Sequence, residues 1–279
     1  MKKRHDGYQI VAFPRMRRLM ITIGRVSSHK HTIRGLVELD VTKARQLMRE
    51  HKASTGEDLS FTAYLAACVG QAVAMNPEVQ AYRTWRSQLV LFDDVDIHIQ
   101  VERDLRGQKF PVPHIVRGAN TKTIRDIHEE IRTVQAQPTR GREVKALPWM
   151  TLLPSFARQI FLWLLFKNPR LIKEYLGTVG LTAVGMFGDR GGWGIGLPSL
   201  HTLGIVVGGI AERPALVDGK VEAHEYLSVT LDFDHDLIDG APAARFTQQL
   251  CDLIESGSGL GDSTLEWEQA RARGTSKKS

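Results

Sequence analysis

Residues 229–246, VTLDFDHDLIDGAPAARF, indicate the architecture of the chain more clearly than any other stretch. Apolar side chains occupy every second position at its start, which predicts a strand with one face against the core. Pro242 lies in the first turn of a predicted helix over residues 241–255, where a missing N–H costs nothing. We therefore predict a strand, a short connection and a helix, with His235 held between them.

In the rest of the chain, the spacing of apolar residues predicts helices that alternate with short strands. We expect helices over 42–55, 61–75, 124–134 and 156–175, the last interrupted near Pro169, strands over 95–101, 180–184 and 203–207, and a hairpin turn at 217–220. This pattern favours one α/β domain over residues 8–256, followed by a disordered tail over 257–279.

Composition excludes several classes of protein. Of 279 residues, 42% are hydrophobic and 24% are charged, which is typical of globular chains rather than disordered ones. The net charge of +6 comes from scattered basic residues without a nucleic-acid-binding motif, so an anionic small molecule is the better partner. The apolar run 160–166 is shorter than the roughly 20 residues that span a bilayer. We expect a cytoplasmic protein without a transmembrane segment, a metal site or a nucleic-acid partner.

His235 and Asp239 are the candidate chemical groups of the quoted stretch. A histidine at a strand end is rigidly placed, and a neutral imidazole can accept a proton near neutral pH. An aspartate at the start of a helix is stabilised as a carboxylate by the helix dipole. A lone histidine after a strand is more often structural than catalytic, so the spacing alone leaves both readings open.

The stretch resembles the acyltransferase catalytic domain of 2-oxo-acid dehydrogenase complexes, the dihydrolipoamide acyltransferase family. The family signature is a histidine, three residues and Asp-Gly, typically followed by Ala-Ala-Arg-Phe. Here these are His235, Asp239-Gly240 and residues 243–246. Segments upstream, such as LVELDVT at 36–42 and LTAVGMFG at 181–188, follow the family's order of elements. The resemblance implies the chloramphenicol acetyltransferase-like fold, a two-layer sandwich of mixed β-sheet and helices.

The resemblance also implies a function and its residues. His235 would be the general base on the thiol of coenzyme A or dihydrolipoamide, and Asp239 would support the site by pairing with Arg17 or Arg18. Coenzyme A, as acyl-CoA, would be a substrate, and lipoamide would be carried by another protein. The implied partners are a lipoylated carrier protein or a 2-oxo-acid dehydrogenase. The implied assembly is a homotrimer or a multiple of trimers.

The sequence departs from the family at several points. Asp236 follows the histidine where the family usually has arginine. The family's oxyanion-stabilising serine falls on Ala183 or Val184, which leaves Thr182 as the candidate donor, with a plain sheet threonine as the alternative. We also expect a stand-alone form, without the lipoyl domain and Pro/Ala-rich linker that a conventional subunit of such a complex would carry. The apolar helix around 160–166 is an addition that serves core or oligomer packing, or else docking to a partner or a membrane surface.

Two other functions stay open. A coenzyme A-dependent acetyltransferase acting on a small hydroxyl or amine is favoured by the missing lipoyl domain, but Asp234 stands before the histidine where that class has a second histidine. A catalytically silent assembly or scaffold subunit is favoured by the altered serine position. The intact His235 and Asp239-Gly240 argue against it, because a scaffold needs neither.

Overall fold

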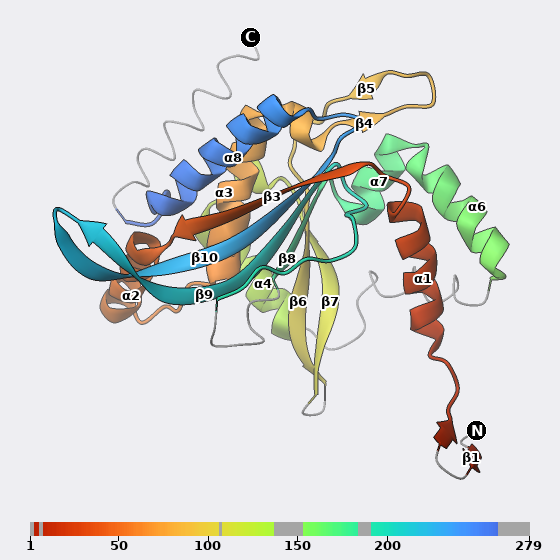
Figure 1. The fold of residues 1–279 in the computed structure, drawn as a ribbon, viewed down its shortest axis with the longest axis horizontal. Coiled ribbons are helices and arrows are strands. Elements are labelled where there is room, and N and C mark those ends of the chain that lie inside the picture. The colour runs from red at the N-terminus through yellow and green to blue at the C-terminus, as the bar shows by residue number, and fades with distance from the viewer. Residues whose placement is uncertain (1–2, 6–7, 106–107, 137–152, 184–190, 262–279) are drawn as a thin grey trace.

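The computed structural model describes residues 3–5, 8–105, 108–136, 153–183 and 191–261. A six-stranded mixed sheet in the order β3-β10-β9-β8-β6-β7 runs through the centre (Figure 1). Its strands are β3 (Thr32–Asp40), β6 (Ile97–Leu105), β7 (Gln108–Val116), β8 (Val179–Ala183), β9 (Leu203–Val217) and β10 (Lys220–Asp234). Two small sheets pair β1 (Lys3–His5) with β2 (Tyr8–Ile10) and β4 (Tyr82–Arg83) with β5 (Leu89–Val90).

Helices cover one face of the large sheet and form its second layer (Figure 1). They are α2 (Thr42–Thr55), α3 (Phe61–Met75), α4 (Ile124–Ala136) and α8 (Gly240–Glu255), with the short 3-10 helices η1 (Pro77–Gln80) and η2 (Ala119–Thr121) beside them. Helix α3 is buried along most of its length, because its own residues are small or apolar on nearly every side. The predicted two-layer α/β sandwich with a mixed sheet is confirmed.

Strand β10 is the centre of the packing. It pairs antiparallel with β3 on one side and β9 on the other, while β8 runs parallel to β9 and β6. Its alternate apolar side chains face the helices, and the rings of Phe233 and Phe246 meet edge-on with centroids 5.8 Å apart. The predicted turn to β9 is confirmed: Asp218 and Gly219 have φ of 49° and 79°, as a two-residue hairpin requires.

The second face of the sheet carries buried polar side chains on β10, including Thr230 and Asp232. Part of it is approached by the backbone of residue 192. Gly209 N–H donates a hydrogen bond of 2.9 Å to the Gly192 carbonyl, and a Cβ on Gly208 would lie 2.1 Å from that oxygen. Gly208 is therefore needed for this close approach.

Three helices stand at one end of the sheet: α1 (Arg15–Ser27), α6 (Ser155–Phe166) and α7 (Pro169–Leu176) (Figure 1). The predicted helix over 156–175 is interrupted as expected, with Asn168 capping α7 and Pro169 at its first position. Leu162 and Leu165 are buried against α1.

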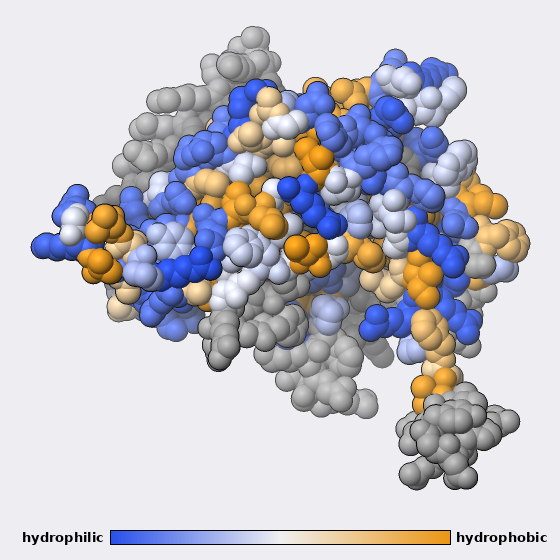
Figure 2. Space-filling view, viewed as in Figure 1, coloured by the Kyte–Doolittle hydropathy of each residue, from blue (hydrophilic) through white to orange (hydrophobic). Residues whose placement is uncertain are grey.

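The apolar helix α6 is only half buried. Phe156, Ile160 and Trp163 are exposed on its outer side, and Figure 2 shows apolar residues there and along α1, bordered by hydrophilic ones. Helix α6 therefore packs through one face and leaves the other uncovered in the single chain. In the part of the chain that the structure describes, none of the helices is both long enough and apolar enough to cross a membrane.

The predicted tail falls mainly on residues 262–279, which lie outside the described part of the chain. Residues 257–261 are described, and Leu260 is buried in the main core.

Candidate active site

His235 lies on the short connection between β10 and α8, which we call the His235 turn (residues 234–239). Strand β10 ends at Asp234, and α8 begins at Gly240 with Asp239 as its N-cap residue. The backbone N–H groups of Leu237 and Ile238 both donate to the Asp234 carbonyl at 3.0 Å. The His235 side chain is 45% exposed, so it stands on a defined turn and is open to a reacting group.

Asp239 is close to His235 but does not fix its ring. Their nearest atoms, Nδ1 and Oδ1, are 3.8 Å apart, and the Asp239 side chain is 87% exposed without a capping hydrogen bond of its own. The expected partners, Arg17 and Arg18, are exposed on α1. Among the ion pairs of the described residues, neither arginine reaches Asp239, so a single chain does not bring the predicted pair together.

The two carboxylates beside His235 are both engaged by the loop that precedes β3. Asp234 pairs with Nζ of Lys30 at 3.0 Å, and Asp236 pairs with Nδ1 of His31 at 2.8 Å. In addition, the backbone N–H of His235 donates to the His31 carbonyl at 2.6 Å. Neither Lys30 nor His31 was predicted from the sequence. The signal present there is that two acidic residues flank one histidine and need cationic partners.

The charges of these groups are coupled. The hydrogen bond from His31 lowers the pKa of the Asp236 carboxyl, and the same bond raises the pKa of His31. Burial lowers the pKa of the Lys30 ammonium, and the nearby Asp234 carboxylate opposes that effect.

Thr182, the predicted oxyanion donor, lies far from His235 within one chain. On β8 it is level with Val206 of β9, which is level with Thr230 of β10. Five residues separate Thr230 from His235, roughly 17 Å of extended strand. Thr182 is exposed, and Ala183 is half-buried. Val184, the other position considered for the family serine, lies outside the described residues.

A buried histidine, His201, and a partly buried one, His98, lie next to this site. His201 Nε2–H donates to the Leu176 carbonyl at 2.8 Å, and its carbonyl accepts from Nζ of Lys30 at 3.0 Å. The His98 ring lies beside it, with centroids 5.9 Å apart. Burial lowers the pKa of His201 to about 3 and that of His98 to about 4, so both rings are neutral near pH 7.

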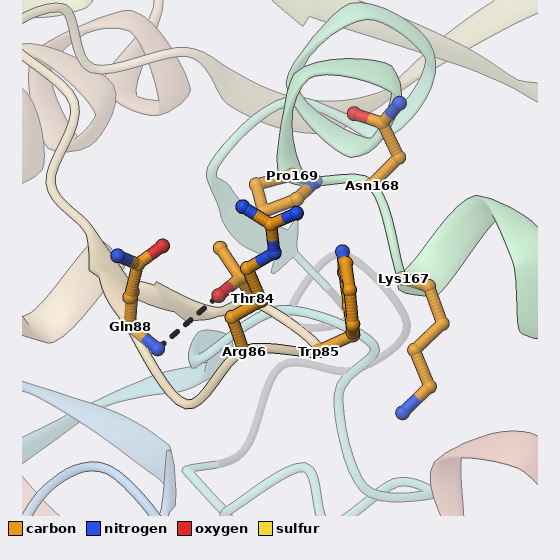
Figure 3. Close-up of a pocket in the computed structure, with 7 residues that line it drawn as sticks. All are labelled: Thr84, Trp85, Arg86, Gln88, Lys167, Asn168 and Pro169. Carbon is orange, nitrogen blue, oxygen red and sulfur yellow. Dashed lines mark hydrogen bonds between the residues drawn. The ribbon is translucent and has the colours of Figure 1, made fainter.

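A hollow of about 420 Å³ borders the His235 turn, and Asp234 and Asp236 form part of its wall while His235 does not. A second hollow, of about 320 Å³, adjoins it at Trp85 and Lys167 (Figure 3). Figure 3 shows the Trp85 ring between Arg86 and Lys167, and the Arg86 guanidinium lies 4.7 Å from the ring centroid. Indole rings and cations of this kind favour an anionic ligand with an apolar part.

Comparison with known proteins matches most of the chain to one family. The family model of 2-oxoacid dehydrogenases acyltransferase (catalytic domain) matches residues 6–146 and 175–260. The succinyltransferase component of the 2-oxoglutarate dehydrogenase complex from Buchnera aphidicola is 25% identical over 229 residues, which cover 81% of this chain and 46% of that protein. The chain spans about half the length of the curated relatives it matches.

Solved structures share the fold. A probable dihydrolipoamide acetyltransferase from Listeria monocytogenes superposes with a TM-score of 0.66 at 18% identity, covering 90% of this chain and 96% of that one. The dihydrolipoamide acetyltransferase of Azotobacter vinelandii, in which catalytic roles of a serine, a histidine and an asparagine were investigated, gives 0.65 at 18%, covering 90% and 93%. Residues 147–174, which include α6, fall between the two stretches that the family model matches.

Proposed function

Because the chain belongs to the family of 2-oxoacid dehydrogenase acyltransferase catalytic domains, we propose that it transfers an acyl group between coenzyme A and a second thiol. The observation that carries the proposal is His235, which stands half-exposed on a turn between a central strand and a helix. That position follows the family signature residue for residue, through Asp239-Gly240 and the Ala-Ala-Arg-Phe run.

The proposed chemistry is a thioester exchange. Neutral His235 accepts the proton of the attacking thiol, and the thiolate adds to the carbonyl carbon of the acyl thioester. The tetrahedral oxyanion then collapses, the bond to the original sulfur breaks, and the departing thiolate takes the proton back from the imidazolium. The histidine is thus regenerated in each cycle, and the acyl group moves between sulfurs without any change in oxidation state.

Asp239 is proposed to support the site rather than to react. As the N-cap residue of α8 it places a negative charge at the positive end of the helix.

Thr182 is proposed as the oxyanion donor from a neighbouring subunit. Thr182 is level with Thr230, which lies five positions, roughly 17 Å of extended strand, before His235, so each chain holds half of a site. A homotrimer, or a multiple of trimers, in which the His235 turn of one chain meets β8 of the next would complete it. The multienzyme core to which the fold is similar, that of a pyruvate dehydrogenase complex, is described as cubic, and an assembly of that kind contains repeated subunit contacts.

Coenzyme A, as acyl-CoA, is the proposed thioester partner, and a lipoyl group carried by another protein, or a 2-oxo-acid dehydrogenase that works with it, is the proposed second partner. The adjoining hollow of about 320 Å³, with Trp85, Arg86 and Lys167 in its wall and no carboxylate, supports a negatively charged substrate. A cytoplasmic location is part of the same proposal.

A thiol-release assay tests the function directly. The protein is incubated with a panel of acyl-CoAs, alone, with dihydrolipoamide, and with small amines or alcohols, and free coenzyme A is measured. Release that depends on dihydrolipoamide supports the proposal. Release that depends on a small amine or alcohol points to the chloramphenicol acetyltransferase type of reaction, and no release in any arm overturns the enzyme in favour of an assembly subunit.

A further inference from the structure

We propose that Lys30 and His31 are positioning residues that hold the His235 turn, and with it the imidazole, in its reactive orientation. The inference rests on the proposed acyl transfer and goes beyond it, because neither residue belongs to the family signature. We call these two consecutive residues the 30–31 latch.

The latch makes three contacts with three consecutive residues. Lys30 pairs with Asp234 and His31 with Asp236, while the His31 carbonyl accepts the backbone N–H of His235 between them. This backbone bond continues the ladder of β3 and β10 by one step, since the last paired residues of those strands are Thr32 and Asp234. The turn is thereby bound to β3 through its backbone and through both neighbours of the histidine.

The latch restricts where the histidine points by holding the residues on both sides of it. Residues 235–237 form a turn, which the N–H groups of Leu237 and Ile238 close on the Asp234 carbonyl. Asp234 and Asp236 both line the 420 Å³ hollow, and His235 does not. With both carboxylates held at the hollow by the latch, the imidazole stays outside its wall.

The Lys30 contact is largely shielded from water, unlike most surface ion pairs. The Lys30 and Asp234 side chains are 21% and 10% exposed, and Nζ also donates to the His201 carbonyl at 3.0 Å. The other oxygen of Asp234 accepts the Asp236 N–H at 3.2 Å, which shapes the turn itself. Removing Lys30 would leave this carboxylate without its cation and free the turn to rearrange.

The partner of His31 is a residue at which the chain departs from the family signature. Asp236 stands where the family usually has arginine, and a carboxylate there can pair with His31 at 2.8 Å whereas an arginine would repel it. Asp236 and His31 therefore form a complementary pair in this chain. It gives the turn a second anchor that the signature alone does not contain.

Two variants and two readouts test the latch. Lys30→Met removes the cation but keeps an apolar chain of similar length, and His31→Ala removes a side chain that is mostly exposed and contributes little packing. We expect Lys30→Met to lower kcat by about 10- to 100-fold with KM for acyl-CoA within about twofold, because misplacement of a reacting group acts on the chemical step. Lys30→Arg should restore most of kcat. The His235 amide should exchange with solvent faster in both Lys30→Met and His31→Ala, as measured by NMR.

The matched control is Lys52→Met, which removes the exposed Lys52–Asp58 pair of 2.9 Å and should change neither readout. If Lys30→Met leaves kcat and His235 amide exchange at wild-type values, the latch is wrong. A fall in kcat without faster exchange and without rescue by arginine also overturns it, in favour of a general structural role. Amide exchange needs no turnover, so a wild-type protein without acyl transfer would overturn the proposed function while the exchange result still decides whether the latch holds the turn.

Discussion

Nδ1 of His235 lies 3.8 Å from Oδ1 of Asp239, outside hydrogen-bond distance, although the two residues are one helical turn apart in sequence. The ring is therefore not oriented by a carboxylate in the manner of a serine-protease triad. Its orientation in the single chain comes from the backbone and from its two neighbours in sequence. The roles of His235 and Asp239 can consequently be separated by substitution.

His235→Ala should lower acyl transfer by about 10²- to 10⁴-fold, the usual contribution of a positioned general base. Its melting temperature should stay close to wild type, because the removed side chain is 45% exposed. The check combines the thiol-release assay with differential scanning calorimetry. Transfer at the wild-type rate in this variant would remove His235 from the mechanism.

Asp239→Asn should reduce the rate less than His235→Ala and cost only about 0.3–1 kcal/mol of stability, since its contribution in one chain is the interaction with the α8 dipole. The sequence alone placed the supporting role of Asp239 in a pair with Arg17 or Arg18, which a single chain does not contain. Chemical denaturation of the assembled protein distinguishes the helix-dipole interaction alone from an additional pair with an arginine. A loss of several kcal/mol would mean that assembly supplies an arginine to Asp239.

Thr182→Val tests whether the site is shared between subunits. Alone, it should lower kcat by about 10²- to 10³-fold, as loss of an oxyanion donor does. Mixed assemblies, formed by co-expressing Thr182→Val and His235→Ala chains, should recover about a quarter of the wild-type rate. Some of their interfaces combine an intact His235 with an intact Thr182. Mixed assemblies that stay as inactive as their parents, although each parent assembles, would contradict a donor from the neighbouring chain.

Two substitutions in α6 should separate packing from exposure. Leu162→Ala removes a side chain buried against α1 and should cost about 2–5 kcal/mol in the unfolding of that region. Trp163→Ser changes a side chain that is 58% exposed and should be nearly neutral in the isolated chain. Urea melts followed by fluorescence report both. A Trp163→Ser protein that loses its oligomeric state would show that the outer side of α6 is a subunit contact.

Much of the fold could be predicted because local periodicity follows burial. Strand β10 alternates strictly near its end, and helix α3 is framed by a Ser60 cap and by Asn76-Pro77. The extension of β9 to Val217 could not be seen, because its outer half lies on a hairpin that faces solvent on both sides and carries no alternation.

The site was only partly predictable for a different reason. His235 and Asp239 are visible in one short run of sequence, whereas Lys30 and His31 lie about 200 residues earlier and meet the turn only because β3 pairs with β10. Likewise, the distance between Thr182 and His235 depends on β8 running parallel to β9 while β10 runs antiparallel. Strand order and register are long-range properties that a local sequence pattern does not predict.

His201, which is buried, and His98, which is partly buried, allow a prediction of how stability changes in acid. His201 has a folded-state pKa of about 3 and His98 of about 4, below the ordinary value of 6.5. Between those values and pH 6.5 the unfolded chain binds protons that the folded chain excludes, so the stability they provide is complete above pH 6.5 and decreases as the pH falls. The free energy of unfolding should therefore drop by on the order of a few kcal/mol between pH 7 and pH 4.

His201→Gln isolates this effect, because an amide can keep the bond to the Leu176 carbonyl but cannot take up a proton. We expect the variant to be less stable than wild type at pH 7, owing to imperfect packing, yet to lose less stability on acidification. His29→Gln, which removes an exposed histidine on a neighbouring loop, is the control and should follow the wild-type curve. Urea unfolding at pH steps from 7 to 4 gives the three curves. Parallel curves for wild type and His201→Gln would show that His201 is protonated in the folded protein. The conclusion that the buried ring beside the Lys30 contact is neutral would then be wrong.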